Sequence, residues 1–161
     1  MTTKAEFNGD EWEKIAAAPA IAGLIVASAQ RGGTIRESLA MAKTYAAAKQ
    51  EHATGDLVGE IVSAAPHLDS KEFSSKEDLH TRGLGKISEA VELVRQKATL
   101  DELVDYREFV LNVAKHAAEA DKSGGFLGIG GERITGQEEA VLSEITAALG
   151  NEPADDAPAP A

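Results

Sequence analysis

Apolar residues recur at helical spacing along most of this chain, and several of the repeats open with a hydroxyl residue followed three positions later by an acid. Three such pairs are Thr34 with Glu37, Thr99 with Glu102, and Thr135 with Glu138. The hydroxyl can accept a hydrogen bond from a free N–H of the first helical turn, and the carboxylate can bond back to the capping residue. Ser75 with Asp78 is a weaker example. These signals predict a chain of successive helices.

The apolar stripes predict about seven helices, and no long segment alternates with period two as a half-buried strand would. The expected ranges are 9–17, 19–30, 34–54, 56–65, 75–97, 99–121 and 136–149. Pro19 suits the first turn of a helix, so the first two ranges are separated there. The clearest stripe, expected to face the core, joins Leu100, Leu103, Tyr106, Val110, Val113 and Ala117. The fold class is therefore predicted to be all-α, a single bundle.

The length of 161 residues suits one domain, which we expect over residues 1–150. Residues 151–161 read NEPADDAPAPA, an acidic Pro/Ala-rich segment with almost nothing to bury, and are predicted to be disordered. Within the domain, residues 20–48 and 113–149 both run from an Ala-rich helix through a Gly-Gly turn to a Thr-x-x-Glu cap. This similarity indicates pseudo-duplicated helix hairpins, although Ala-rich helices with good caps also look alike by chance.

The balance of charge and the absence of cysteine exclude several functions. The net charge is −11, with 27 acidic and 16 basic residues and no basic stripe, so nucleic acid would be repelled. Without cysteine there are no disulfides or thiolate metal sites. The most apolar stretch, 16–29, is shorter than the roughly 20 residues that a spanning helix needs and contains a proline. We expect a cytoplasmic protein with no membrane partner and no signal peptide.

The segment GGFLGIGG at 124–131 is the least helical part of the predicted domain. A phosphate-binding loop would continue with Lys-Ser/Thr, but Glu132 follows instead. A calcium loop starting at Asp121 would place Ser123 and Glu132 at ligand positions, yet Gly125 offers no side-chain oxygen and Phe126 replaces the turn glycine. Neither reading predicts tight specific binding.

Three apolar side chains in this glycine-rich loop, Phe126, Leu127 and Ile129, have two possible roles. In the first, the glycines allow tight turns that fold these side chains back onto the helices as a connector. In the second, they form an exposed apolar tip that inserts into a protein partner or a second subunit. Both roles stay open at the level of sequence, and the second makes these residues the candidate partner-binding site.

An Ala-rich helix, a glycine loop and then Ile-Thr-x-x-Glu-Glu at the start of a helix resemble the TerB-like proteins of bacterial tellurite-resistance and stress operons. The matching residues are Ala120, Asp121, Gly124, Ile134, Thr135, Glu138 and Glu139. The resemblance implies a small all-helical bundle with acidic loops, and a divalent-cation site at Asp121, Glu132 and Glu138. The first hairpin has Gln30-Arg31 where the family would carry an acid, and the FLGIG insertion is foreign to the short family turn.

The sequence contains no complete catalytic motif. Glu77-x-x-His80 has the spacing found in di-iron bundles, but no second such motif accompanies it. No Gly-x-Ser-x-Gly elbow is present. We therefore expect a non-catalytic protein without cofactor that acts by protein–protein contact through the loop 124–131, as an adaptor or homo-oligomer. The alternative is a cation-binding TerB-like stress protein with an acidic loop site.

Overall fold

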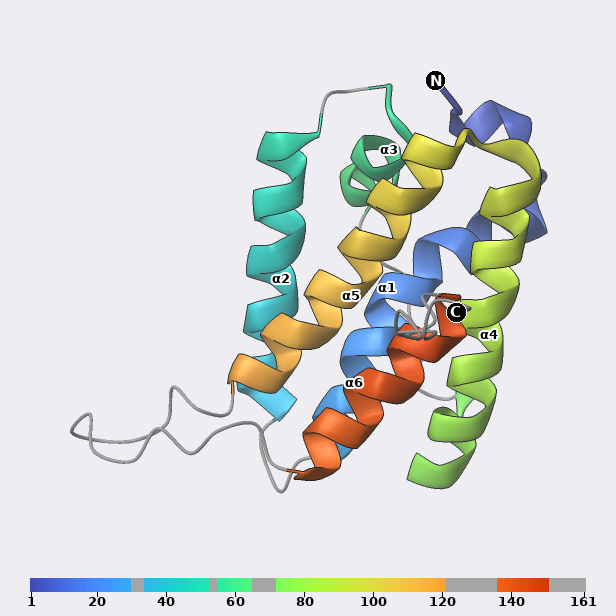
Figure 1. The fold of residues 1–161 in the computed structure, drawn as a ribbon. Coiled ribbons are helices and arrows are strands. Elements are labelled where there is room, and N and C mark those ends of the chain that lie inside the picture. The colour runs from blue at the N-terminus through green and yellow to red at the C-terminus, as the bar shows by residue number, and fades with distance from the viewer. Residues whose placement is uncertain (30–33, 53–54, 65–71, 121–135, 151–161) are drawn as a thin grey trace, which may run out of the picture.

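The computed structural model describes residues 1–29, 34–52, 55–64, 72–120 and 136–150. All regular structure in these ranges is helical, which confirms the predicted all-α class (Figure 1). The elements are a short 3₁₀ turn η1 (Lys4–Glu6) and the helices α1 (Gly9–Ala29), α2 (Thr34–Glu51), α3 (Leu57–Ser63), α4 (Lys76–Lys97), α5 (Leu100–Ala120) and α6 (Gly136–Ala148).

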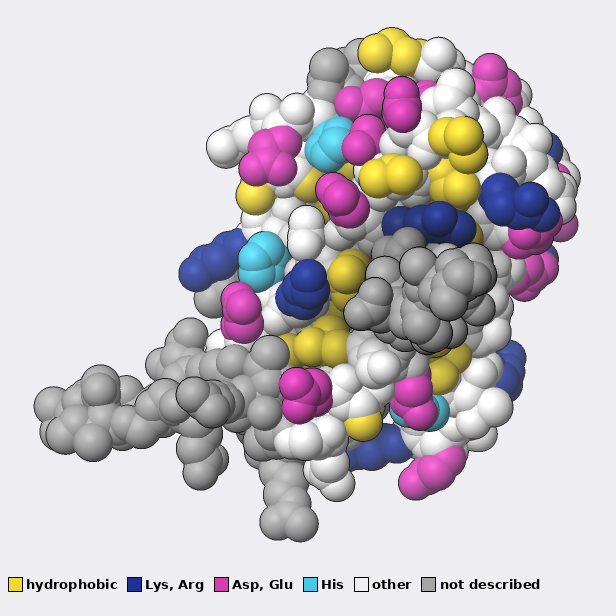
Figure 2. All heavy atoms as spheres, in the orientation of Figure 1, with side chains coloured by type: hydrophobic (Ala, Val, Ile, Leu, Met, Phe, Trp, Pro, Cys, Tyr) yellow, Lys and Arg dark blue, Asp and Glu magenta, His cyan; other side chains and the backbone are white. Residues whose placement is uncertain are grey.

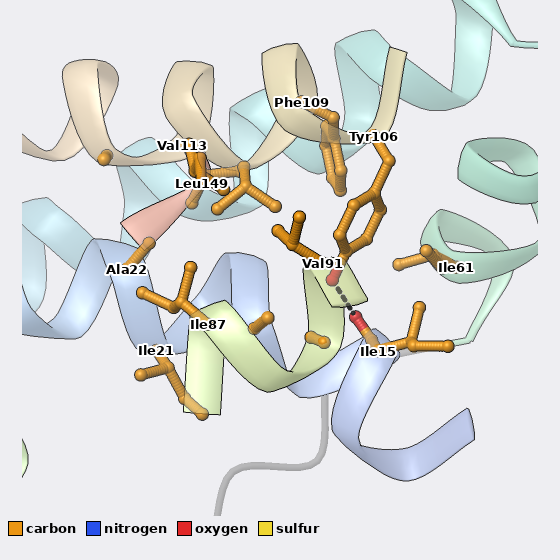
Figure 3. Close-up of a cluster of buried hydrophobic side chains, with 14 of the residues drawn as sticks. Ile15, Ile21, Ala22, Ile61, Ile87, Val91, Tyr106, Phe109, Val113 and Leu149 are labelled. Atoms are coloured by element: carbon orange, nitrogen blue, oxygen red, sulfur yellow. Dashed lines mark hydrogen bonds between the residues drawn. The ribbon is translucent and has the colours of Figure 1, made fainter. Parts of the chain in front are cut away.

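The described ranges contain six helices, so the expectation of about seven was wrong at one place. Residues 9–17 and 19–30 were expected to be separate, but α1 continues through Pro19. Proline has no N–H to donate to the carbonyl four residues earlier, which here belongs to Ile15. The Tyr106 hydroxyl, from α5, donates to this carbonyl over 2.9 Å (Figure 3). A side chain distant in sequence therefore supplies the hydrogen bond that Pro19 removes.

Helix α1 is the centre of the bundle. It packs most extensively against α5 and α4, and α6 also contacts it (Figure 1). Helix α2 lies mainly against α5, and α3 contacts both α2 and α5. By length and composition alone α1 could also cross a membrane, but it supplies ten buried residues to this core. The expected absence of a membrane partner stays a prediction.

A small residue lets two central helices, α1 and α4, approach closely. Gly83 of α4 faces Ile21 and Ile25 of α1, and a Cβ atom at Gly83 would lie only 2.9 Å from Cδ1 of Ile25. Elsewhere in the core, Tyr45 of α2 and Phe109 of α5 meet edge to face with their ring centroids 5.3 Å apart. Gly83 and Gly85 do not interrupt α4, which is continuous.

The predicted cap at the start of α5 is confirmed. The Glu102 N–H donates to Oγ1 of Thr99, and both the N–H and the hydroxyl of Thr99 donate to Oε2 of Glu102. The Glu102 carboxylate also accepts from the N–H and the hydroxyl of Thr2, and so attaches the N-terminal residues to α5. Ser75 caps α4 by accepting from the Asp78 N–H. Thr135 lies outside the described residues.

Glu102→Gln should lower the free energy of unfolding by about 1–2 kcal/mol at pH 7, because it weakens a cap and the N-terminal attachment together. Partial burial alone would raise the pKa of Glu102, but hydrogen bonds from Thr2 and Thr99 outweigh burial and lower that pKa to about 2. Since the folded-state pKa lies below the ordinary 4.5, the stabilisation is complete above pH 4.5 and is lost as pH falls towards 2.

The measurement is urea unfolding of both proteins at pH 7, 3.5 and 2.5. The difference between wild type and Glu102→Gln should shrink across this series. Asp101→Asn, a change at the neighbouring exposed position, is the control and should be nearly neutral. A difference that stays constant with pH would contradict the role of the ionised carboxylate.

Candidate functional site

Most of the site residues predicted from sequence lie outside the described residues. This holds for Phe126, Leu127 and Ile129 of the proposed tip, and for Asp121 and Glu132 of the proposed cation site. Glu138 is described: it lies in the first turn of α6, is only 5% exposed, and has an interaction partner. Within the described ranges, no three His, Asp or Glu residues are arranged to hold a metal ion.

The isolated Glu77-x-x-His80 motif is part of a contact between helices. Nε2 of His80 lies 2.9 Å from Oε2 of Glu144, which joins α4 to α6. Glu77 and His80 line the same open depression at the start of α4, together with Ser28 and Ala29 of α1. One imidazole beside one carboxylate fits a contact on the surface of the bundle better than a di-iron site.

Among the residues whose side chains the structure describes, the large exposed hydrophobic ones lie at one end of the bundle. They are Met1 at 87% exposure, Leu100 at 79% and Val104 at 49%. Leu100 and Val104 are one turn apart on α5, and Thr2, which follows Met1, is bonded to Glu102 in the same turn. Figure 2 shows hydrophobic side chains among acidic ones at the top of the view, where α5 begins.

The exposure of Leu100 corrects the prediction that it faces the core with Leu103 and Tyr106. Its cause is the end of α6. A Cβ atom at Gly150, just after α6, would lie 3.1 Å from Nη2 of Arg107, so α6 ends beside Arg107. Leu100 precedes Arg107 by about two turns on α5, beyond the reach of α6. We call Leu100, Val104 and Arg107 the α5 flank.

The end of α6 is fixed between two helices. From α4, the Ser88 hydroxyl donates to the Ala148 carbonyl over 3.1 Å. From α5, Arg107 lies against Gly150, whose positive φ of 73° suits glycine after a helix end. Nε of Arg107 is buried and has no hydrogen-bond partner in the part of the chain that the structure describes. The α5 flank therefore combines exposed apolar side chains with an unsatisfied cationic donor.

A second candidate site is a cleft of about 230 Å³ between α2 and α5. Its lining includes three carboxylates and two imidazoles but no lysine or arginine, and Phe109 with two alanines supplies the apolar part. The ionisable lining residues are Glu51, His52, Asp105, Glu108 and His116. Such a lining favours a positively charged ligand over an anion.

Both imidazoles in the α2–α5 cleft are oriented by neighbouring groups. Nδ1 of His116 lies 2.9 Å from the Thr44 hydroxyl, and Nδ1 of His52 lies 3.3 Å from Oδ2 of Asp56. These contacts leave Nε2 of each ring as the nitrogen available to a ligand. The spacing Glu108, Asn112, His116 on α5 is visible in the sequence as a polar stripe, but the pairing of α2 with α5 is not.

Comparison with known proteins does not assign a role to the α5 flank or to the α2–α5 cleft. No family model, curated protein or solved structure matches the chain.

Proposed function

We propose that this protein is non-catalytic and acts through protein–protein contact, as an adaptor or by self-association. The observation that carries this proposal is the exposure of Leu100 and Val104, one turn apart on a helix that is otherwise well packed. Single exposed apolar residues are common on protein surfaces. Here two adjacent ones share one end of the bundle with exposed Met1, and such a group offers a partner apolar surface to bury.

Replacing both Leu100 and Val104 with serine should weaken association at least tenfold, because it removes the apolar surface of the contact. The free energy of unfolding should change by less than about 1 kcal/mol, since both side chains are already exposed. Sedimentation velocity measures self-association, and capture from the native host compares partner binding. The matched control is Lys115→Ser with Glu119→Ser, which changes two exposed residues of α5 at the same spacing, outside both candidate sites and with no change in net charge.

The glycine-rich loop 124–131 remains a separate proposed contact. Phe126→Ser with Ile129→Ser should abolish association if the loop is an exposed tip, and should cost several kcal/mol of stability with association intact if the loop is docked. Comparing this pair with Leu100→Ser and Val104→Ser identifies which apolar group a partner uses. If neither pair weakens association, the proposed function is wrong at both places.

Cation binding is a second proposed function, and the lining of the α2–α5 cleft favours it. It differs from the site expected at Asp121, Glu132 and Glu138, which stays a prediction. No three of these carboxylates and imidazoles are arranged to ligate an ion directly, so a divalent cation would keep its water shell and be held by the negative charge of the lining. The ion should raise the melting temperature, because a ligand bound only to the folded state stabilises it.

Titration with Zn²⁺ or Mn²⁺ tests the proposed cleft site through this rise in melting temperature. Glu108→Gln with His116→Gln should remove this rise, whereas Asp121→Asn with Glu132→Gln should leave it intact. The opposite pattern would place the ion at the glycine-rich loop. No rise at millimolar ion in the wild-type chain would contradict both cation sites.

We also propose the duplicated hairpins at 20–48 and 113–149, the TerB-like relationship and the cytoplasmic location, each on the sequence features given above. For the hairpins, contacts between α1 and α2 and between α5 and α6 support the proposal. The turns that would be compared, 30–33 and 121–135, lie outside the described residues.

A further inference from the structure

The α5 flank is an apolar face that lacks a cover at the point where α6 stops. Upstream of Arg107, Val104 is 49% and Leu100 is 79% exposed, whereas Ala114 and Ala118, further along α5, are fully buried. Because α6 ends beside Arg107, a chain that continued in the same direction would pass over Val104 and Leu100. The occupant that fits this face best should therefore begin near Gly150.

Arg107 identifies the chemistry of this occupant. A buried N–H without a partner destabilises the protein, and Nε of Arg107 is such a group in the described part of the chain. No ion pair joins Arg107 to a described carboxylate. Asp101 follows Leu100 and Asp105 follows Val104. One residue turns an α-helix by about 100°, so these two carboxylates lie on another side of α5 from the flank. An occupant of the flank should be apolar and should carry an acid near Arg107.

We propose that residues 151–161 of the same chain dock on the α5 flank and compete there with a protein partner. This segment follows Gly150 directly and combines three acids, Glu152, Asp155 and Asp156, with alanines and prolines. Its composition alone predicts disorder, but docking supplies the apolar burial that the segment cannot provide by itself. The competition with a partner rests on the proposed function, whereas the docking itself does not.

The geometry of the connection favours this segment over a second copy of the chain. Leu100 lies about 10 Å beyond Arg107 along the axis of α5, at 1.5 Å per residue. A Pro-rich chain extends about 3 Å per residue, so roughly four residues after Gly150 reach it. A tethered segment also acts at an effective concentration near the millimolar range. A second copy has no tether and must approach against the repulsion between two net charges of −11, so the tethered segment occupies the flank ahead of it.

The absence of cysteine makes disulfide trapping in the full-length chain a direct test. Leu100→Cys combined with Ala154→Cys should form an intramolecular disulfide at least tenfold faster than Asp101→Cys combined with Ala154→Cys. Position 101 is at nearly the same distance along α5 but on another side, so it controls for random tail motion. Adding Arg107→Gln should slow the first reaction severalfold. Equal rates at 100 and 101, or an intermolecular disulfide at 100, would overturn the docking.

A second measurement separates the docking from the proposed function. In the full-length chain, Glu152→Gln with Asp155→Asn and Asp156→Asn should weaken docking and raise association severalfold. If the disulfide preference holds but association does not rise, the segment docks and the flank is not the partner contact, which overturns the competition. If association rises without a disulfide preference, the flank binds a partner and the docking is wrong.

Discussion

Tyr106→Phe is expected to lower the free energy of unfolding by about 2 kcal/mol, although it removes only one oxygen atom. The Tyr106 side chain is fully buried, and its hydroxyl donates to the carbonyl of Ile15 that Pro19 leaves without its helical donor (Figure 3). Phenylalanine would keep the packing but leave that carbonyl unsatisfied in the core, and a buried unsatisfied acceptor costs about 1–3 kcal/mol. Urea unfolding followed by circular dichroism measures the change.

Tyr45→Phe is the matched control, because it makes the same chemical change nearby with the opposite expectation. The Tyr45 hydroxyl is buried and has no hydrogen-bond partner among the described atoms. Removing it should be neutral or slightly stabilising. Burial raises the pKa of Tyr45 and of Tyr106 above 10, so both hydroxyls stay protonated in the folded protein at neutral pH. The difference between the effects of Tyr106→Phe and Tyr45→Phe on the free energy of unfolding should therefore be the same from pH 6 to 9.

Pro19→Ala tests the mechanism, since alanine restores a backbone N–H four residues after Ile15. When Tyr106→Phe is added to Pro19→Ala, it should cost less than about 1 kcal/mol, which gives a coupling of about 1–2 kcal/mol between positions 19 and 106. If Tyr106→Phe is equally costly with proline and with alanine at position 19, the hydroxyl does not replace the helical donor.

The same pair of residues explains why sequence patterns predicted the fold class but miscounted the helices. Periodicity and caps are local signals, so α4, α5 and α6 began and ended within a residue or two of the expected ranges. A proline is also read locally, as a break. Whether a helix continues through Pro19 depends on a donor 87 residues away, the separation of positions 19 and 106, and no local signal contains it.

The two candidate surfaces also depend on contacts between helices that local sequence patterns do not show. Leu100 lies on the edge of the α5 stripe, and only the place where α6 stops decides that it is exposed. The α2–α5 cleft unites Glu51 and His52 with Glu108 and His116, which no spacing rule connects. Whether the glycine-rich loop 124–131 is docked or exposed stays open, because the loop lies outside the described residues. Apolar and acidic residues could be identified from sequence, but their neighbours across the bundle could not.

Gly83→Val should have the largest effect of the changes considered, a loss of about 3 kcal/mol or more in the free energy of unfolding. A Cβ atom at this position would lie 2.9 Å from Cδ1 of Ile25 and 3.0 Å from Cγ2 of Ile21. Both isoleucines are almost fully buried in α1, so they cannot turn aside into solvent. The two further methyl groups of valine would force α1 and α4 apart, and such overpacking costs about 1–3 kcal/mol, occasionally more.

Gly85→Ala, two positions further along α4, separates this steric effect from helix propensity. No atom outside its own helix turn lies within 4 Å of the Cβ position at Gly85, so alanine should stabilise the helix by about 0.5–1 kcal/mol. At this chain length, 1 kcal/mol corresponds to about 2–4 °C in melting temperature. Gly83→Val should therefore melt at least about 6 °C below wild type and Gly85→Ala slightly above it. If Gly83→Val melts at the same temperature as the wild type, α1 and α4 do not approach each other closely at Gly83.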